Sequence, residues 1–358
     1  MQCDLTVVIA SLNGEARIER CLRALDKQTV GPFIEKIVVD DGSTDATSKI
    51  ARENGARVLR HLSNQGVAAA RNTGAEAASS PIVAFLDDDC EPDQEWAERL
   101  LLEYADGVVG VGGAIHASSG AGIISSYLRR RNRHEPLELN LAKSEKIPYR
   151  FYLYLRKQWT FAQPSPRRNV YAFAGANMSF ARDAFVAVGG LDERFRYGAE
   201  EQDFCRRLLS ALPGSRLVFV PEASVVHYFD AKLYRTLKRN YAYGRGAAQF
   251  YRKWPTVRPT IFPGPFLLLA VAGLAGFFPD LLPLVVLMPY ALYPMSIRYA
   301  FAERRWTYLL DSYLQLAQEL WENAGFITGL WKFRHFPIYA PESSAEVLSE
   351  PKESRGSI

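Results

Sequence analysis

The chain has 358 residues, of which 48% are hydrophobic and 23% are charged, and its 43 Lys and Arg against 39 Asp and Glu give a formal net charge of +4. This composition excludes an intrinsically disordered chain and a collagen-like repeat. The length fits one large domain with an appendage, or two domains. The small positive excess is not the basic stripe of a nucleic-acid binder, so we expect no nucleic acid among its partners.

The four cysteines, Cys3, Cys21, Cys90 and Cys205, are far apart and form no CxxC pair. Four cysteines can form disulfides in a secreted chain, but this spacing favours buried thiols in a reducing cytosol over a metal site. The N-terminus runs into a short apolar strand without a basic start and a long apolar stretch, so we expect no secretory signal. These patterns predict a cytoplasmic location for the catalytic part.

Short apolar runs alternate with segments of helical spacing over the first 90 residues. Residues 5–10 form an apolar run that is too short for a helix and rich in β-branched residues, which predicts a buried parallel strand. The expected strands are residues 5–10, 34–40, 57–60 and 82–86, and the expected helices are residues 18–25, 44–53 and 67–78. This alternation predicts a doubly wound α/β fold with a parallel sheet.

The amino-acid composition changes between residues 116 and 166, where the chain is basic and rich in tyrosine and has four arginines in residues 129–133. We interpret it as a mobile insertion over the site and assign it no secondary structure. The arginine cluster is typical of a solvated surface, and binding of phosphates or anionic lipid head groups is the alternative. Regular structure is expected again at residues 172–180, and an acidic helix near Glu200.

The last third of the chain differs in charge. Residues 231–260 contain eight Lys and Arg and no acidic residue, which predicts a basic interfacial segment. Residues 261–278 and 281–297 carry no charge and flank Asp280. A spanning helix needs about 20 apolar residues for a core of about 30 Å, so each run alone is marginal. Together they predict a membrane hairpin within residues 261–298, with Asp280 at its turn because a carboxylate at bilayer depth costs at least ~2.5 kcal/mol.

The flanks of this hairpin predict its orientation. Cations on both sides place both ends in the cytoplasm, so we expect the inner membrane, with the catalytic domain facing the cytoplasm. A buried helical hairpin of a soluble protein, favoured by five prolines, and a re-entrant hairpin remain alternatives. Residues 299–340 show helical spacing that suits an amphipathic interfacial segment, and the polar tail 341–358 is expected to be disordered.

Three acidic clusters end predicted strands or open helices. They are Asp40 with Asp41, Asp87 to Asp89, and Glu200 with Glu201 and Asp203. Ligands of an open parallel sheet bind at the carboxyl ends of its strands, so the first two clusters should line one crevice. A divalent cation is the simplest compensation for crowded carboxylates, and oxygen ligands select Mg²⁺ or Mn²⁺ that enters with a diphosphate. Residues 42–44 alone indicate only a turn and a helix cap.

The chain resembles family 2 glycosyltransferases, which are inverting enzymes of the GT-A fold that use nucleotide-sugar donors. The motifs that carry the resemblance are residues 7–13, 37–45, 64–66, 69–74, 85–89, 175–179, 189–193 and 200–203. The resemblance covers residues 4–230. It implies a Rossmann-like nucleotide-diphospho-sugar transferase domain over residues 1–230 with a mostly parallel sheet.

The resemblance also implies roles for individual residues. Asp41 matches the carboxylate that accepts a hydrogen bond from the nucleotide base of the donor. Asp87 and Asp89 match the Asp-x-Asp motif, whose last carboxylate binds the metal that bridges the donor diphosphate. His227 matches an imidazole ligand of the same metal, and an ordinary histidine at a strand end is the alternative. The implied donor-binding residues are Ser11, Asn13, Asp40, Asp41, Asn64, Arg71 and Asp88.

Glu201 falls where the family's Glu-Asp motif places its catalytic base. This chain has Glu-Glu instead, so Glu200 and Asp203 remain candidates. A carboxylate within hydrogen-bond reach takes the proton of the acceptor hydroxyl as it attacks the anomeric carbon from the face opposite the leaving group. One such displacement inverts the configuration.

Residues 239–246 resemble a stretch that follows the catalytic domain in membrane-attached members, which favours a lipid-linked acceptor or a cell-envelope glycan; attachment to an anionic leaflet is the alternative. The Gln-x-x-Arg-Trp motif of processive synthases is missing after the base, so we expect transfer of a single sugar.

Two other functions are alternatives to sugar transfer. A nucleotidyltransferase requires a Gly-rich N-terminal loop that residues 11–14 do not provide, and the intact acidic set argues against an inactive, membrane-anchored sugar-nucleotide-binding protein.

Overall fold

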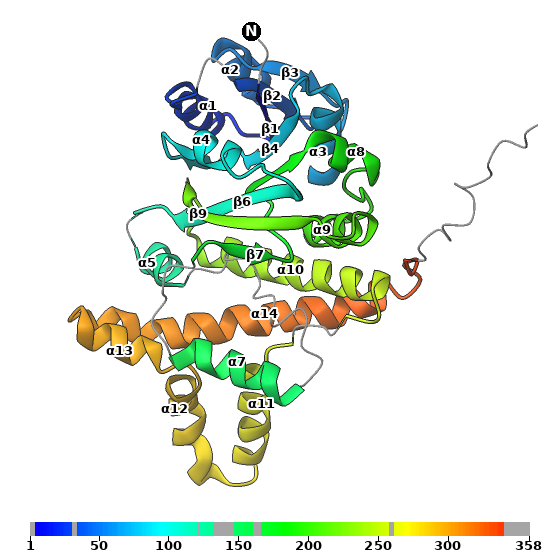
Figure 1. Ribbon diagram of the computed structural model, residues 1–358. Helices are drawn as coiled ribbons and strands as arrows, with labels where there is room; N and C mark the ends of the chain where they lie inside the picture. The colour runs from blue at the N-terminus through cyan, green and yellow to red at the C-terminus, as the bar shows by residue number, and fades with distance from the viewer. Residues whose placement is uncertain are drawn as a thin grey trace, which may run out of the picture.

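A computed structural model describes residues 4–30, 34–120, 122–131, 147–159, 166–257 and 261–339. Figure 1 shows an α/β domain at the N-terminal end, a layer of long helices that crosses beneath it, and a helical hairpin that projects from this layer. The predicted disordered tail, residues 341–358, lies outside the described residues.

The N-terminal half forms a parallel sheet in the order β3-β2-β1-β4. Its strands are β1 (Leu5–Ser11), β2 (Ile34–Asp40), β3 (Arg57–Arg60) and β4 (Ile82–Asp87). Its helices are α1 (Ile18–Asp26), α2 (Thr47–Glu53) and α3 (Val67–Ala77). All seven predicted elements are confirmed, because short apolar runs form the strands and segments of helical spacing form the helices that pack on them.

The second half of the sheet is mixed. The strand β8 runs antiparallel to both β4 and β6, whereas β9 runs parallel to β6 and antiparallel to β5 and β7. The strands are β5 (Cys90–Pro92), β6 (Val108–Ala117), β7 (Arg168–Val170), β8 (Asn177–Ala181) and β9 (Arg216–His227), and the helices are α4 (Trp96–Leu101), α8 (Arg182–Ala187) and α9 (Glu200–Ala211). The sheet is therefore mostly parallel only in its N-terminal part.

Two apolar cores lie on opposite faces of the sheet. Val7 and Ile9 face the core that includes side chains of α1 and α4, and Val8 faces the core that includes α3 and α9. A Cβ on Gly74 of α3 would lie 2.2 Å from Val8 Cγ1. Glycine at this position therefore lets α3 lie close against β1.

The basic segment forms one long helix, α10 (Leu233–Lys253), which packs along α14 (Asp311–Lys332) beneath the sheet (Figure 1). Glycines permit this close approach. A Cβ on Gly244 would lie 1.9 Å from the Glu322 carbonyl oxygen, and one on Gly325 would lie 2.0 Å from that of Tyr241. The predicted interfacial helix is thus in large part an internal packing partner, with polar residues such as Glu319 buried.

The insertion, to which the sequence analysis assigns no secondary structure, contains two helices in its described part, α5 (Ile123–Arg130) and α7 (Ile147–Trp159). Arg130 donates two hydrogen bonds of 2.8 Å to Asp311 and lies 3.3 Å over the Tyr308 ring. Its partners lie about half the chain away in sequence, and local spacing cannot show such a pairing. The insertion is anchored to the C-terminal helices.

The projecting hairpin consists of α11 (Pro263–Ala275), a short 3₁₀ turn η2 (Pro279–Leu281) and α12 (Leu282–Leu292), followed by α13 (Met295–Ala302) and a second 3₁₀ turn η3 (Trp306–Leu310). Within the described residues, no single helix combines the length and apolarity of a membrane crossing. Pro279–Leu292 and Met295–Ala302 meet both criteria only jointly, and they are bent by 70° at the break between them. Pro294 lies at this break, so the second uncharged run is two helices.

We predict that Gly74→Ala lowers the free energy of unfolding by about 1–3 kcal/mol, because the added methyl overpacks the contact with Val8. Urea denaturation of the purified chain measures this change. The matched variant Gly273→Ala adds its methyl to open space in α11, and it should leave the unfolding free energy unchanged or slightly higher. Equal values for the two variants would contradict the close packing of α3 on β1.

Candidate active site

The carboxyl ends of β1, β2 and β4 meet at one edge of the sheet, where open α/β sheets bind ligands. The Asp41 amide donates to the Ser11 carbonyl oxygen at 2.9 Å, and the Ser11 hydroxyl donates to Asp88 at 2.5 Å. The first two acidic clusters are therefore joined through the end of β1.

Asp40 shapes the turn after β2. Its side chain is fully buried and accepts hydrogen bonds from the Ser43 amide at 2.8 Å and from the Ser48 hydroxyl. Burial raises the pKa of Asp40, but these hydrogen bonds outweigh it and keep the pKa below its usual value. Asn13, at φ +50°, binds the same turn. Its backbone N–H donates a hydrogen bond of 2.9 Å to the Ser43 hydroxyl, and its side-chain Oδ1 accepts a hydrogen bond of 3.0 Å from the backbone N–H of Thr44.

Asp41 fastens the next loop to the sheet edge. Its carboxylate accepts hydrogen bonds of 2.8 Å from the amides of Gln65 and Gly66, and it lies 2.7 Å from Nδ1 of His61. The exposed Asn64 precedes these amides, so Asp41 and Asn64 lie at the same loop. Sequence reasoning missed His61, because nothing local to this histidine shows that it pairs with a carboxylate in another motif.

Asp88 points away from its two neighbours. It accepts two hydrogen bonds of 2.9 Å from Arg17 and one from Ser11. Ser11 and Asp88, expected among the donor-binding residues, therefore bind each other and Arg17, and they hold the end of β4 against the loop after β1.

Asp87, Asp89 and His227 form the acidic cluster most suited to a cation. His227 Nε2 lies 3.4 Å from Asp89 Oδ1 and 3.8 Å from Asp87 Oδ2. The pairing of β5 with β9 brings His227 to the end of β4. Two carboxylates and an imidazole are a ligand set that suits Mg²⁺ or Mn²⁺.

The electrostatics of this cluster fit a cation as well. Burial, with repulsion from Asp87 and Asp88, raises the pKa of Asp89 to about 6. A bound cation would favour the ionised form and reverse this effect. Potential ligand atoms of Asp89, Cys90 and His227 lie within 4.8 Å of one another. Burial raises the pKa of the Cys90 thiol, which disfavours a thiolate ligand.

Arg71 bridges the metal cluster and the helix of the candidate base. This buried guanidinium donates to Asp87 Oδ1, to Glu200 Oε1 and to the Gly175 carbonyl oxygen, each at 2.9 Å. A Cβ on Gly175 would lie 2.9 Å from the guanidinium. Burial raises the pKa of Asp87, but the nearby His227 and the Arg71 guanidinium outweigh burial and hold the pKa well below its usual value. Arg71, expected to bind the donor, is occupied with these protein partners.

The helix α9 starts after two residues in left-handed conformations, Gly198 at φ +99° and Ala199 at φ +72°. Glu200 is buried and paired with Arg71, and its Oε2 makes no hydrogen bond within the described residues. Glu201 is partly exposed, and burial together with the adjacent Glu200 raises its pKa to about 8. A carboxylate with a raised pKa is suited to take up a proton near neutral pH.

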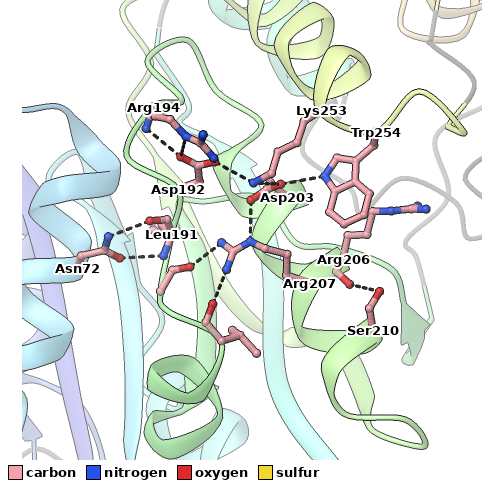
Figure 2. A network of polar contacts seen from close by, with 12 residues as sticks. Asn72, Leu191, Asp192, Arg194, Asp203, Arg206, Arg207, Ser210, Lys253 and Trp254 are labelled. Carbon is pink, nitrogen blue, oxygen red and sulfur yellow. Dashed lines mark hydrogen bonds and ion pairs between the residues drawn. The ribbon is translucent and has the colours of Figure 1, made fainter. Parts of the chain in front are cut away.

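Asp203 is a structural residue (Figure 2). One of its oxygens accepts from Trp254 Nε1 at 2.8 Å and lies 2.7 Å from Lys253 Nζ, and the other accepts from Arg207 Nε at 2.9 Å. Because the side chain is completely buried and both oxygens are engaged, Asp203 is an unsuitable proton acceptor. This removes it from the three candidate bases and makes it the link between α9 and the end of α10.

Asn72 holds the loop before α9, a role that sequence reasoning missed. It exchanges two hydrogen bonds of 2.9 Å with the backbone of Leu191 (Figure 2). Lys253 pairs with Asp192 in the same loop at 2.8 Å. The motif around Asn72 was visible in the sequence, but its partner is a backbone segment more than a hundred residues away.

These observations define an α/β protein with an acidic, cation-suited cluster of side chains at the carboxyl edge of its sheet. The chain matches the family profile described as glycosyl transferase family 2 over residues 6–185, and that of glycosyl transferase family group 2 over residues 138–317. It belongs to glycosyl transferase family 2, which confirms the resemblance of its motifs.

Two named relatives show how far the likeness extends. The chain is 31% identical over 257 residues to the pre-mycofactocin glycosyltransferase of Mycobacterium tuberculosis, covering 70% of this chain and 48% of the relative. It is 26% identical over 263 residues to the glucosyl-dolichyl phosphate glucuronosyltransferase of Haloferax volcanii, covering 68% of this chain and 76% of that protein. The chain thus spans about half the length of the mycobacterial relative.

A solved structure shares the fold. The mannosyltransferase PcManGT from Pyrobaculum calidifontis, in complex with GDP-Man and Mn²⁺, has a TM-score of 0.53 and 20% identity, with 93% of this chain and 88% of that chain covered. This likeness supports the expected GT-A-like α/β fold.

We predict that Lys253→Met lowers the free energy of unfolding by about 3–5 kcal/mol, because it leaves the buried carboxylates of Asp192 and Asp203 without their shared cation. Urea denaturation of the full chain measures the change. Lys238→Met removes an exposed lysine of the same helix and should shift stability by less than about 0.5 kcal/mol. If both variants shift stability equally, the network in Figure 2 does not hold α9 in place.

Proposed function

We propose that this chain transfers one sugar from a nucleotide-diphosphate sugar to an acceptor hydroxyl, with inversion at the anomeric carbon. The observation that carries the proposal is the convergence of three functional groups at one edge of the sheet. Asp41 is linked to β1 by the Ser11 carbonyl, and the Asp87 and Asp89 cluster is linked to the helix of Glu201 by Arg71.

The donor would bind across the ends of β1, β2 and β4, with its base toward Asp41 and Asn64 and its diphosphate toward the cluster of Asp87, Asp89 and His227. These three residues would hold Mg²⁺ or Mn²⁺, which when bound neutralises the charge that develops on the departing nucleoside diphosphate. The pKa of Asp89, which burial and then the nearby carboxylates of Asp87 and Asp88 raise, supports a cation there. The solved mannosyltransferase of similar fold, in complex with GDP-Man and Mn²⁺, agrees with this proposal.

Glu201 would act as the base. Its carboxylate takes the proton of the acceptor hydroxyl while the acceptor oxygen attacks from the face opposite the leaving group. Glu200 is neutralised by Arg71 and Asp203 by three donors, whereas Glu201 is partly exposed and has a raised pKa. The bond to the leaving phosphate oxygen breaks as the new glycosidic bond forms, so no covalent sugar intermediate is required.

The acceptor in this proposal is lipid-linked or a cell-envelope glycan, and the chain lies at the inner membrane with its catalytic domain toward the cytoplasm. Arg239 of α10 lies 4.9 Å over the Phe229 ring, which stacks on His227 at 3.8 Å. A cation that can contact an acceptor phosphate thus lies one aromatic ring away from the candidate metal cluster. The name of the Haloferax relative, which includes a dolichyl phosphate, supports an acceptor of this class.

We predict that Glu201→Gln lowers kcat by about 10²–10⁴-fold while the donor Kd stays nearly unchanged, because only proton transfer is lost. In the wild type, kcat/KM should rise with pH through a midpoint near 8 and level off about one pH unit higher, since the base must be ionised and burial favours its protonated form. Steady-state assays measure both, with a donor found by a thermal-shift screen of nucleotide sugars with Mn²⁺.

Unchanged turnover in Glu201→Gln would assign the base to another group. The variant Glu201→Asp keeps the carboxylate and should recover part of the activity. Inactivity of the wild type with every donor that it binds would favour a sugar-nucleotide-binding protein over a transferase.

We predict that Asp89→Ala abolishes the increase in donor affinity that Mn²⁺ gives to the wild type, because it removes one carboxylate ligand. Isothermal titration of the donor with and without Mn²⁺ measures this increase. Asp106→Ala removes an exposed aspartate that precedes β6 and should retain it. A wild type that is equally active in the presence of a chelator would remove the metal from the proposed reaction.

A further inference from the structure

The hairpin of α11 and α12 exposes large apolar side chains almost without interruption. Between residues 266 and 288, Ala275 is the one buried residue. The exposed large side chains are Phe266, Leu267, Leu269, Leu274, Phe277, Phe278, Leu282, Leu284, Val286 and Leu287. Figure 1 shows the two helices side by side, projecting away from the α/β domain. Exposure on this scale marks an interaction surface.

The distribution of these side chains favours a fluid hydrocarbon phase as the partner. Residues 266, 267, 269 and 272 of α11 are all exposed. Successive residues of a helix differ by about 100° in direction, so these four spread over roughly 220°, more than half of the helix circumference. A partner protein buries one face of a helix pair, whereas lipid chains surround the pair on all sides. We propose that the hairpin inserts into a single leaflet of a lipid bilayer. This inference rests on the membrane attachment proposed above and gives its depth and topology.

The helix lengths fit one leaflet. At about 1.5 Å per residue, the 13 residues of α11 extend about 20 Å and the 11 residues of α12 about 16 Å. The hydrocarbon core of a bilayer is about 30 Å thick, so one leaflet contributes about 15 Å. A hairpin of this length carries its tip, residues 277–280, toward the middle of the bilayer. The turn then does not keep the Asp280 carboxylate out of the hydrocarbon, although the sequence predicts that it does, and the cost of this carboxylate there opposes insertion.

Polar contacts at the base of the hairpin fix how far it projects. Glu319 of α14 is completely buried and accepts hydrogen bonds from Tyr293 at 2.7 Å and from Tyr154 of α7 at 2.9 Å. Asn323 exchanges two hydrogen bonds with the backbone of Phe262, of 2.8 and 3.1 Å. Both ends of the hairpin are thus tied to α14.

The layer around the base has the composition of a bilayer interface. The helix α7 exposes Tyr149, Tyr152 and Trp159, and the segment after the hairpin exposes Phe301 and Trp306. In Figure 1, α7 and α13 lie across the end from which the hairpin projects. Tyrosine and tryptophan are enriched at the level of the lipid head groups. The insertion, through α7, therefore contributes to the same membrane surface.

Labelling from the two sides of a membrane tests the topology. The full chain, with Cys3→Ser to remove the thiol outside the described residues, is reconstituted into vesicles that contain anionic lipid. A membrane-impermeant maleimide is then added outside or trapped inside. Phe277→Cys at the tip should be labelled from neither side until detergent is added, and Arg305→Cys, exposed beyond the hairpin, from the side of the catalytic domain only.

Each other result decides against the inference. Labelling of Phe277→Cys from the side opposite the catalytic domain would show a hairpin that crosses the bilayer. In a flotation assay, the purified chain is mixed with vesicles and centrifuged in a density gradient. If the chain does not rise with the vesicles, and if its tip cysteine reacts with the maleimide without detergent, the apolar hairpin is a surface for a protein partner.

A second variant measures depth. Asp280 is the single charged residue within 261–297 and lies at the tip. If the tip lies in hydrocarbon, Asp280→Leu should strengthen partition into vesicles by about tenfold or more, since the charged residue is costly there. If the tip lies in water, either on the far side of the bilayer or because the hairpin does not bind lipid, Asp280→Leu should not strengthen partition into vesicles. Asp106→Leu, on the surface of the α/β domain, controls for added hydrophobicity.

The inference and the proposed function fail separately. A tip labelled from the far side in a chain that still transfers sugar would overturn only the one-leaflet topology. A protected tip in a chain inactive with every donor would overturn only the transferase.

Discussion

The central interaction of this structure is the ion pair network of Arg71. A buried guanidinium is stable only when carboxylates and carbonyl oxygens surround it, and here Asp87 and Glu200 supply the charges. One carboxylate ends β4 and the other opens α9, more than a hundred residues later. Their shared cation therefore brings the candidate metal cluster and the candidate base to one place, and the missing side chain of Gly175 makes room for it.

The C-terminal helices α10 and α14 stabilise this arrangement, because α10 contacts the helix that carries Glu201. Asp203, on the same helix as Glu201, is bound by Lys253 and Trp254 at the end of α10. The helix α10 in turn packs on α14, and α14 holds the base of the apolar hairpin through Glu319. A series of packed helices, with buried polar contacts at both ends, thus connects the proposed catalytic residues with the surface that we propose to meet lipid.

Local patterns predicted the N-terminal half well and the remainder in part. Strands and helices up to residue 87 were expected nearly where they lie, because each is short and buried against one sheet. The helices of the insertion were not expected, since Arg130 and Tyr154 find their partners on α14. The second uncharged run was taken as continuous, whereas Pro294 lies at a bend between two helices.

The sequence by itself determined the α/β alternation, the acidic motifs and the apolar C-terminal runs, because these are properties of neighbouring residues and of their periodicity. Only the tertiary structure decided which carboxylates are committed to partners. Asp88, Asp203 and Arg71 belong to motifs that resemble binding or catalytic ones, and each is engaged by a residue distant in the chain: Arg17, Lys253 and Glu200, respectively. The function of a charged side chain depends on its burial and its counter-charge, and both are set by contacts that sequence spacing does not show.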